Sequence, residues 1–151
     1  MKLGAAGKAL IQSFEQCRLT AYMDGGGVWT IGWGHTGREV HEGLTCTQEQ
    51  ADAWFDQDVA VAVNALNKAL DVAVNQNQFD ALVSFTFNVG VRHATQSTLL
   101  RDVNAKRFAE AADEFPKWCH DNGETIPGLL RRRRAEQALF RGVSPEPAAA
   151  T

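Results

Sequence analysis

The sequence predicts an α+β protein of two lobes, in which a small N-terminal lobe carries a β-hairpin and a larger lobe is all-helical. Two observations predict this class. Apolar residues alternate with a period of two between about residues 20 and 34, where five of the thirteen glycines also fall. Most of the remaining chain of 151 residues shows helical spacing. We expect a cleft at the junction of the lobes.

The length favours one domain, predicted over residues 1–145. Its lobes are expected at about 1–46 and 69–145, joined by a helix at about 47–68. The last residues, 146–151, are predicted to form a disordered tail.

The first predicted helix covers residues 3–16 and places Glu15 in its last turn. Its apolar stripe, which we expect to be buried, consists of Leu3, Gly7, Leu10, Ile11 and Phe14.

A hairpin or three-stranded sheet is predicted next, with a turn that begins at Asp24-Gly25. Alternation places one set of side chains on the face of Thr30 and the aromatic set on the other. The first set is Val28, Thr30, Gly32 and Gly34, and the second is Trp29, Ile31 and Trp33.

Start and stop signals divide the remaining chain into helices. Thr47 followed by Gln50 is a capping-box start for the connecting helix. The next helix is predicted to begin near Asn75 or Asn77 and to end at Gly90, and its apolar residues surround it, so we expect it to be buried. The lobe is completed by shorter helices at about 95–104 and 106–114 and by a last helix from Pro127 to Phe140.

Composition excludes several classes of function. The net charge of −3 does not favour binding to nucleic acid or to anionic membranes. No run of eighteen apolar residues predicts a transmembrane helix, and polar residues interrupt the apolar N-terminus, so we predict no signal peptide. The three cysteines are an odd number without metal-ligand spacing, so we expect free thiols, no metal and no cofactor.

Glu15, Asp24 and Thr30 are the candidate catalytic residues. Cleavage of a glycosidic bond needs a proton donor and a second carboxylate that activates water or attacks the sugar. The two acids have different surroundings, a helix end for Glu15 and an open glycine turn for Asp24, as an acid and a base require. From the residues alone, two solvated acids beside a tight surface hairpin remain the alternative.

The spacing of these three residues, followed by TIGWGHTG, resembles the phage T4-type lysozyme family, glycoside hydrolase family 24. Three later segments also resemble its motifs and extend the likeness over about residues 5–141. They are QFDALVSFTFNVG at 78–90, STLL at 97–100 and PGLLRRRRAE at 127–136.

The resemblance implies a lysozyme-like fold and a muramidase that hydrolyses β-1,4 bonds between N-acetylmuramic acid and N-acetylglucosamine. It makes Glu15 the general acid, Asp24 the base or electrostatic partner, and Thr30 the residue that holds the attacking water. An inverting reaction is implied, and the carboxylates of inverting enzymes lie about 6.5–9.5 Å apart.

Further site residues are predicted from their position in the chain and from the same resemblance. The expected substrate contacts are Gly34, His35, Phe87 and Asn88, and the expected cleft-supporting residues are Arg132 and Arg133, one of which would reach Glu15. For His35, which follows the strand, we favour the alternative of a structural hydrogen bond or ion pair with a helix acid. For Arg131 and Arg134 we favour a solvated helix face.

The resemblance also implies an endolysin that acts on peptidoglycan as a monomer, without nucleic acid or a membrane anchor. It would stay in the host bacterial cytoplasm until a holin-type membrane protein gives access to the periplasm and cell wall. The alternatives are a lytic transglycosylase or chitinase, or a non-catalytic protein that acts on the wall or membrane through its basic C-terminal helix. The last alternative depends on the positive charge of residues 116–141, which include six Lys and Arg residues and three acids.

Overall fold

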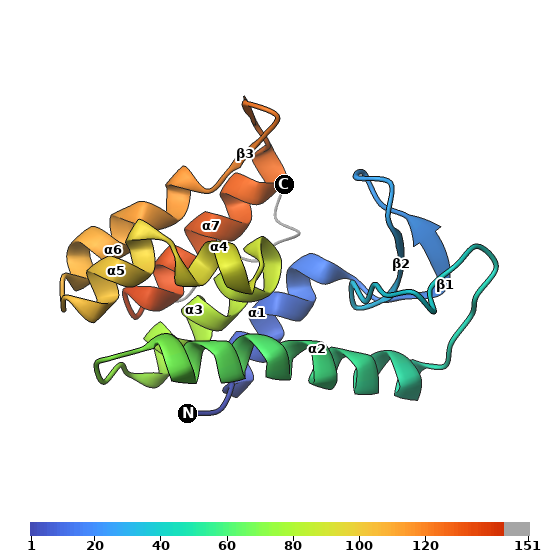
Figure 1. Ribbon diagram of the computed structural model, residues 1–151, viewed down its shortest axis with the longest axis horizontal. Helices are drawn as coiled ribbons and strands as arrows, with labels where there is room; N and C mark the ends of the chain where they lie inside the picture. The colour runs from blue at the N-terminus through green and yellow to red at the C-terminus, as the bar shows by residue number, and fades with distance from the viewer. Residues whose placement is uncertain (144–151) are drawn as a thin grey trace.

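The two-lobed α+β arrangement is present in the computed structural model, which describes residues 1–143 (Figure 1). The long helix α2, Gln48–Ala69, runs along the bottom of the view from the β-hairpin on the right to the helical lobe on the left. The predicted tail, 146–151, lies outside the described residues.

The N-terminal hairpin has the predicted turn. Strands β1, Arg18–Met23, and β2, Trp29–Gly32, are antiparallel, with Tyr22 opposite Thr30 and an irregular register between Arg18 and Tyr22. The sheet has two strands, and a bridge from Thr20 to Thr45 adds a further pairing at its edge.

Helix α1, Ala5–Glu15, is shorter than the predicted range 3–16 and has Glu15 in its last turn as predicted. It buries Leu10 and Ile11 in the same core as the helices of the C-terminal lobe. No side chain of its own caps its N-terminus. Instead, the buried carboxylate of Asp80 accepts hydrogen bonds from the Gly4 and Gly7 N–H groups at 2.9 and 3.3 Å. A negative charge at this end stabilises the helix. Because Asp80 belongs to α3, Gln76–Val89, this contact sets the direction of α1 and therefore the position of Glu15 at its other end.

Helix α3, Gln76–Val89, is the centre of the helical lobe. Every residue from Phe79 to Thr86 is buried, as expected for a helix that is apolar nearly all round. Asn75 and Gln78 form a complete capping box at its start, and Gly90, at φ +97°, ends it. Thr47 likewise caps α2, because its hydroxyl accepts from the Gln50 N–H at 3.1 Å.

The region after Gly90 differs from the prediction. The two expected helices, at about 95–104 and 106–114, are present with later starts, and a short helix before them and a 3₁₀ turn after them were not predicted. The Ser97 side chain starts the first expected helix by accepting from Leu100 N–H, and Lys106, at φ +61°, follows its end. These elements are α4, Val91–Thr95, α5, Thr98–Asn104, α6, Phe108–Glu114, and η1, Phe115–Lys117.

The segment before the last helix forms a small hairpin that we did not predict. Its strands are β3, His120–Asp121, and β4, Glu124–Thr125, and it projects from the helical lobe in Figure 1. Helix α7 then runs over Pro127–Phe140, as predicted, and packs on α3. Leu139 and Phe140 are buried in the core, so the apolar side of this helix is not available as a membrane-binding face.

Cys17, Cys46 and Cys119 all carry free thiols. Among residues 1–143, no helix is both long enough and apolar enough to span a bilayer.

Candidate active site

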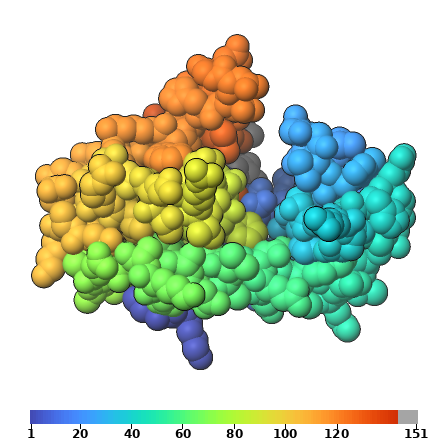
Figure 2. Space-filling view, in the orientation of Figure 1, coloured from blue at the N-terminus to red at the C-terminus, as the bar shows by residue number. Residues whose placement is uncertain are grey.

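A cavity of about 520 Å³ opens between the lobes. Figure 2 shows the surface hollowed between the blue N-terminal hairpin and the yellow and orange part of the helical lobe. Six of the predicted site residues line the cavity, namely Glu15, Asp24, Thr30, Gly34, Phe87 and Asn88. The lining also includes residues that we did not predict, among them Tyr22, Thr36, Asp58 and Val61.

Of the missed residues, Tyr22 left a signal in the sequence. Tyr22 lies two positions before Asp24, so strand alternation places both on one face. Asp58 lies four residues before Ala62, one helical turn away, and both line the cavity. The sequence alone did not show that this face of α2 borders a cleft.

Glu15 is held by a guanidinium from the other end of the chain. Arg132 Nη1 donates to Glu15 Oε2 at 2.7 Å. Glu15 Oε1 lies against Gly34, where an added Cβ would stand 2.6 Å from this oxygen. One carboxylate oxygen is therefore engaged by Arg132, and the other is packed against a residue that has no side chain.

A buried charge cluster on α7 supports this contact. Glu136, fully buried, lies 3.4 Å from Arg132 Nε and 2.6 Å from Arg133 Nε, and it accepts from Ser84 Oγ at 2.6 Å. Burial lowers the pKa of Arg133, and the charge of Glu136 opposes that effect. Both predicted supporting arginines are thus placed beneath the cleft.

Arg133 connects the cluster to the cleft surface. Its Nη2 donates to Asn88 Oδ1 at 2.8 Å. Because the Asn88 oxygen accepts from Arg133, the Asn88 amide NH₂ is left to donate elsewhere.

Arg131 and Arg134 are exposed, as we expected for a solvated face. Of the four consecutive arginines, Arg131 to Arg134, two therefore face solvent and two are buried. The buried pair, Arg132 and Arg133, contacts Glu15 and Glu136. The structure does not form a continuous basic surface from these four arginines.

Asp24 and Thr30 are fixed by the hairpin turn. Asp24 Oδ1 accepts from the N–H groups of Gly26 and Val28 at 2.9 and 2.8 Å. The Val28 carbonyl accepts from both the Asp24 N–H and the Thr30 hydroxyl, each at 3.0 Å. One backbone oxygen thus sets the positions of both residues, and Thr30 Oγ1 keeps its lone pairs for a further hydrogen bond.

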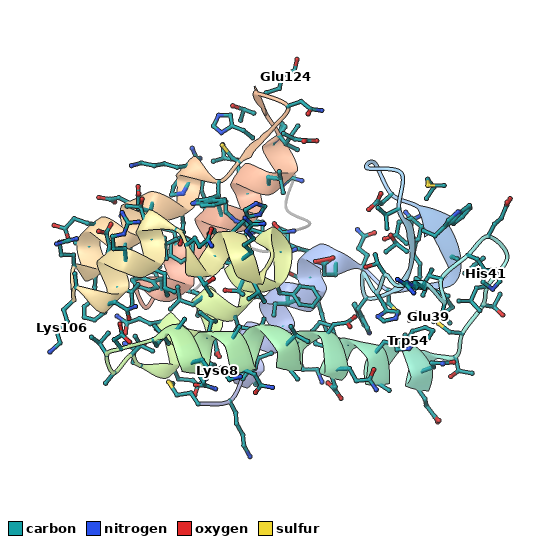
Figure 3. All side chains as sticks on the ribbon, in the orientation of Figure 1. Glu39, His41, Trp54, Lys68, Lys106 and Glu124 are labelled. Atoms are coloured by element: carbon teal, nitrogen blue, oxygen red, sulfur yellow. The ribbon has the colours of Figure 1, made fainter. Side chains whose placement is uncertain are left out.

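His35 is not brought to the cavity. Its ring is buried, stacks on Trp54 at 4.6 Å, and places Nδ1 2.7 Å from Asp58 and Nε2 2.6 Å from Glu39. Trp54 and Glu39 are labelled in Figure 3, near the hairpin end of α2. Both ring nitrogens are engaged, so the structure favours the ion-pair alternative over the predicted sugar contact.

The fold and the two carboxylates in one cavity indicate the lysozyme class of proteins. The family model described as phage lysozyme matches residues 12–136. The endolysin of Bacillus phage PZA is 45% identical over 148 residues, which are 97% of this chain and 57% of that protein. The chain therefore belongs to the phage lysozyme family.

Two further similarities cover nearly the whole length of both chains. The endolysin of Acyrthosiphon pisum secondary endosymbiont phage 1 is 42% identical over 93% of this chain and 98% of its own. The solved muramidase domain of SpmX from Asticaccaulis excentricus is 43% identical, with a TM-score of 0.84 over 92% of this chain and 97% of that domain.

His35 predicts a pH-dependent contribution to stability. Burial opposes its protonation, but the hydrogen bonds with Asp58 and Glu39 outweigh burial and raise the pKa of His35 above 6.5. A raised folded-state pKa stabilises the fold fully below the unfolded value of 6.5, and this contribution is lost as the pH rises through the folded value. We expect His35→Gln to lower the free energy of unfolding by about 1–3 kcal/mol at about pH 6, and by less at about pH 9.

Urea denaturation at the two pH values measures this difference. His41→Gln is the matched control, because the exposed His41 ring contacts the Glu42 carbonyl and no carboxylate. An equal loss of stability for His35→Gln at both pH values would contradict the assignment.

Proposed function

We propose that this chain is an endolysin that hydrolyses the β-1,4 bonds between N-acetylmuramic acid and N-acetylglucosamine in peptidoglycan. One observation carries the proposal: Glu15 and Asp24 line one cavity but are held by different partners, a buried guanidinium and backbone N–H groups. Glycoside hydrolysis needs two carboxyl groups in different environments. The similarity to a muramidase domain supports the same reaction.

Glu15 is the proposed general acid. Arg132 engages Oε2, which leaves Oε1 to carry the proton that passes to the leaving glycosidic oxygen. Arg132 is a positioning residue in this scheme, since it fixes the carboxyl group and contacts no sugar. The absence of a side chain at Gly34 leaves space beside Oε1 for the bond that is cleaved.

Asp24 and Thr30 are proposed to hold the attacking water. Thr30 donates its own hydrogen to Val28 O, so its oxygen accepts from the water. Asp24 Oδ1 is occupied by two backbone donors, which leaves Oδ2 to accept the second water hydrogen. A water held through both hydrogens directs a lone pair at the anomeric carbon, and Asp24 takes its proton as the bond forms.

This arrangement favours an inverting reaction, in which water attacks on the face opposite the leaving group. A lytic transglycosylase uses a hydroxyl of its own substrate and has no need of a water site, so the Asp24–Thr30 pair favours hydrolysis. Asn88 and Phe87 are the proposed sugar contacts on the helical lobe, where Arg133 leaves the Asn88 amide free to donate.

The decisive test compares the wild type with Glu15→Gln and Asp24→Asn on purified peptidoglycan. We expect both variants to lose at least about 100-fold in rate, the lower range for a general acid or base. Mass spectra of wild-type products should show reducing ends, and 1,6-anhydro ends would indicate a transglycosylase. Folded variants that clear peptidoglycan at the wild-type rate would refute the assignment.

Gly34→Ala should reduce activity through Glu15. The added Cβ would stand 2.6 Å from Oε1, at a position where φ is +82°, so the carboxyl group or the loop must move. A 1 Å misplacement in an active site costs on the order of 100-fold in rate. Peptidoglycan turnover measures the effect, and Gly25→Ala is the control, because its Cβ meets no atom within 4 Å. Similar rates for the two variants would contradict the proposed role of this space.

We also propose that the protein acts as a monomer and stays in the host cytoplasm until a holin-type membrane protein gives it access to the wall. Lysis of producing bacteria should then require co-expression of a holin or permeabilisation of the inner membrane. Lysis without either would contradict this part of the proposal.

A further inference from the structure

Tyr22 is the one tyrosine of the chain, and it lines the cavity beside the proposed catalytic residues. It lies directly opposite Thr30 in the β1–β2 register. Opposed residues of an antiparallel pair project from the same face of the sheet. Tyr22 and Thr30 therefore share the wall of the cleft that Asp24 also lines.

Arg18 holds the Tyr22 ring in place. The guanidinium carbon lies 4.5 Å from the ring centroid, in a cation–π contact. This contact fixes the ring through its face and uses no hydrogen bond of the phenol. Both residues belong to β1, so the hairpin itself supplies the support.

The phenol is close enough to both carboxylates to be affected by their charges. Burial raises the pKa of Tyr22, Arg18 opposes this effect, and the charges of Glu15 and Asp24 add to the increase. The hydroxyl therefore stays protonated near neutral pH and is a donor.

Three groups near the two carboxylates accept hydrogen bonds only or are already engaged as donors. The Asp24 carboxylate only accepts, Thr30 donates its hydrogen to Val28 O, and the Arg132 Nη1 group donates to Glu15. A sugar in the cleft presents hydroxyl and ring oxygens. If these oxygens lose water and gain no hydrogen-bond donor from the protein, the sugar binds more weakly.

We propose that Tyr22 is a substrate-binding residue, whose hydroxyl donates a hydrogen bond to an oxygen of the sugar that lies between Glu15 and Asp24. This inference rests on the proposed muramidase function. It assigns the hairpin wall a contact with the sugar itself, in addition to the water held by Asp24 and Thr30.

Tyr22→Phe removes the hydroxyl and keeps the ring on Arg18. We expect kcat/KM on peptidoglycan to fall about three- to tenfold, as for loss of one neutral hydrogen bond, while the unfolding midpoint stays unchanged. Met23→Leu is the matched control, because Met23 is the next residue of the strand, is exposed, and is not part of the cavity lining. Its kinetics should equal those of the wild type.

A second variant tests the role of Arg18. Arg18→Met should lower kcat/KM when it is the only substitution. It should have little further effect in the Tyr22→Phe variant, because both changes weaken the same hydrogen bond from the phenol to the sugar. Additive effects of the two substitutions would show that Arg18 does not act through the phenol.

The outcomes separate this inference from the proposed function. If the wild type releases reducing ends and Tyr22→Phe has unchanged kcat and KM, the inference is overturned and the function stands, even if the variant unfolds more easily. If the wild type releases no reducing ends, the function fails, and affinity for a soluble N-acetylglucosamine–N-acetylmuramic acid tetrasaccharide decides the inference. Weaker binding by Tyr22→Phe than by Met23→Leu supports it, and equal binding overturns it.

Discussion

The ion pair between Glu15 and Arg132 is the contact on which the site depends, because it joins residues 117 positions apart at the base of the cleft. Arg132 is 4% exposed, so its charge needs an acid partner. Glu136 lies between Arg132 and Arg133, and the Glu15 carboxyl group gives Arg132 a further acceptor at 2.7 Å. The proposed acid is thus also a hydrogen-bond partner of a buried guanidinium.

Helical geometry explains how a run of four arginines serves this cluster. Successive residues of an α-helix turn by about 100°, so two adjacent residues can face the core while their neighbours face solvent. Arg132 and Arg133 face inward, and Glu136 lies four and three residues later, on the same side. Ser84 of α3 adds a donor to Glu136, so the central helix takes part in the same balance.

The sequence predicted what depends on neighbouring residues. The hairpin turn, the Thr47 cap, the end of α3 at Gly90 and the start of α7 at Pro127 follow from local backbone rules, and all are present. The break between α4 and α5 depends on one side-chain cap, that of Ser97, and the break between α5 and α6 follows Lys106 at φ +61° and has no side-chain cap. The four residues of β3 and β4 are too few to show a period.

Contacts between distant segments were harder to predict. The resemblance correctly pointed to an arginine at Glu15, but no local pattern distinguishes the two inward arginines or links Arg133 to Asn88. For His35, the position after the strand left a sugar contact and a structural ion pair open. Its partners Glu39 and Asp58 decide for the ion pair, and Asp58 lies in another segment, α2. The face of α2 that borders the cleft, with Asp58, Val61 and Ala62, depends on how α2 packs against both lobes.

The proposed acid, Glu15, and the proposed water site, Asp24 and Thr30, are held in place by separate sets of contacts. Asp24 and Thr30 share one carbonyl acceptor within the hairpin, so their relative position survives small movements of the helical lobe. Glu15 is set by α3 at one end of α1 and by Arg132 at the other. The Gly34 loop connects these two systems, since an added Cβ there would meet Glu15 Oε1 and the next residue, His35, is anchored to α2 through Asp58. The chain forms a second connection, because only Gln16 and Cys17 separate the end of α1 from the start of β1. The spacing between the acid and the water site therefore depends on this loop and on the short link between α1 and β1.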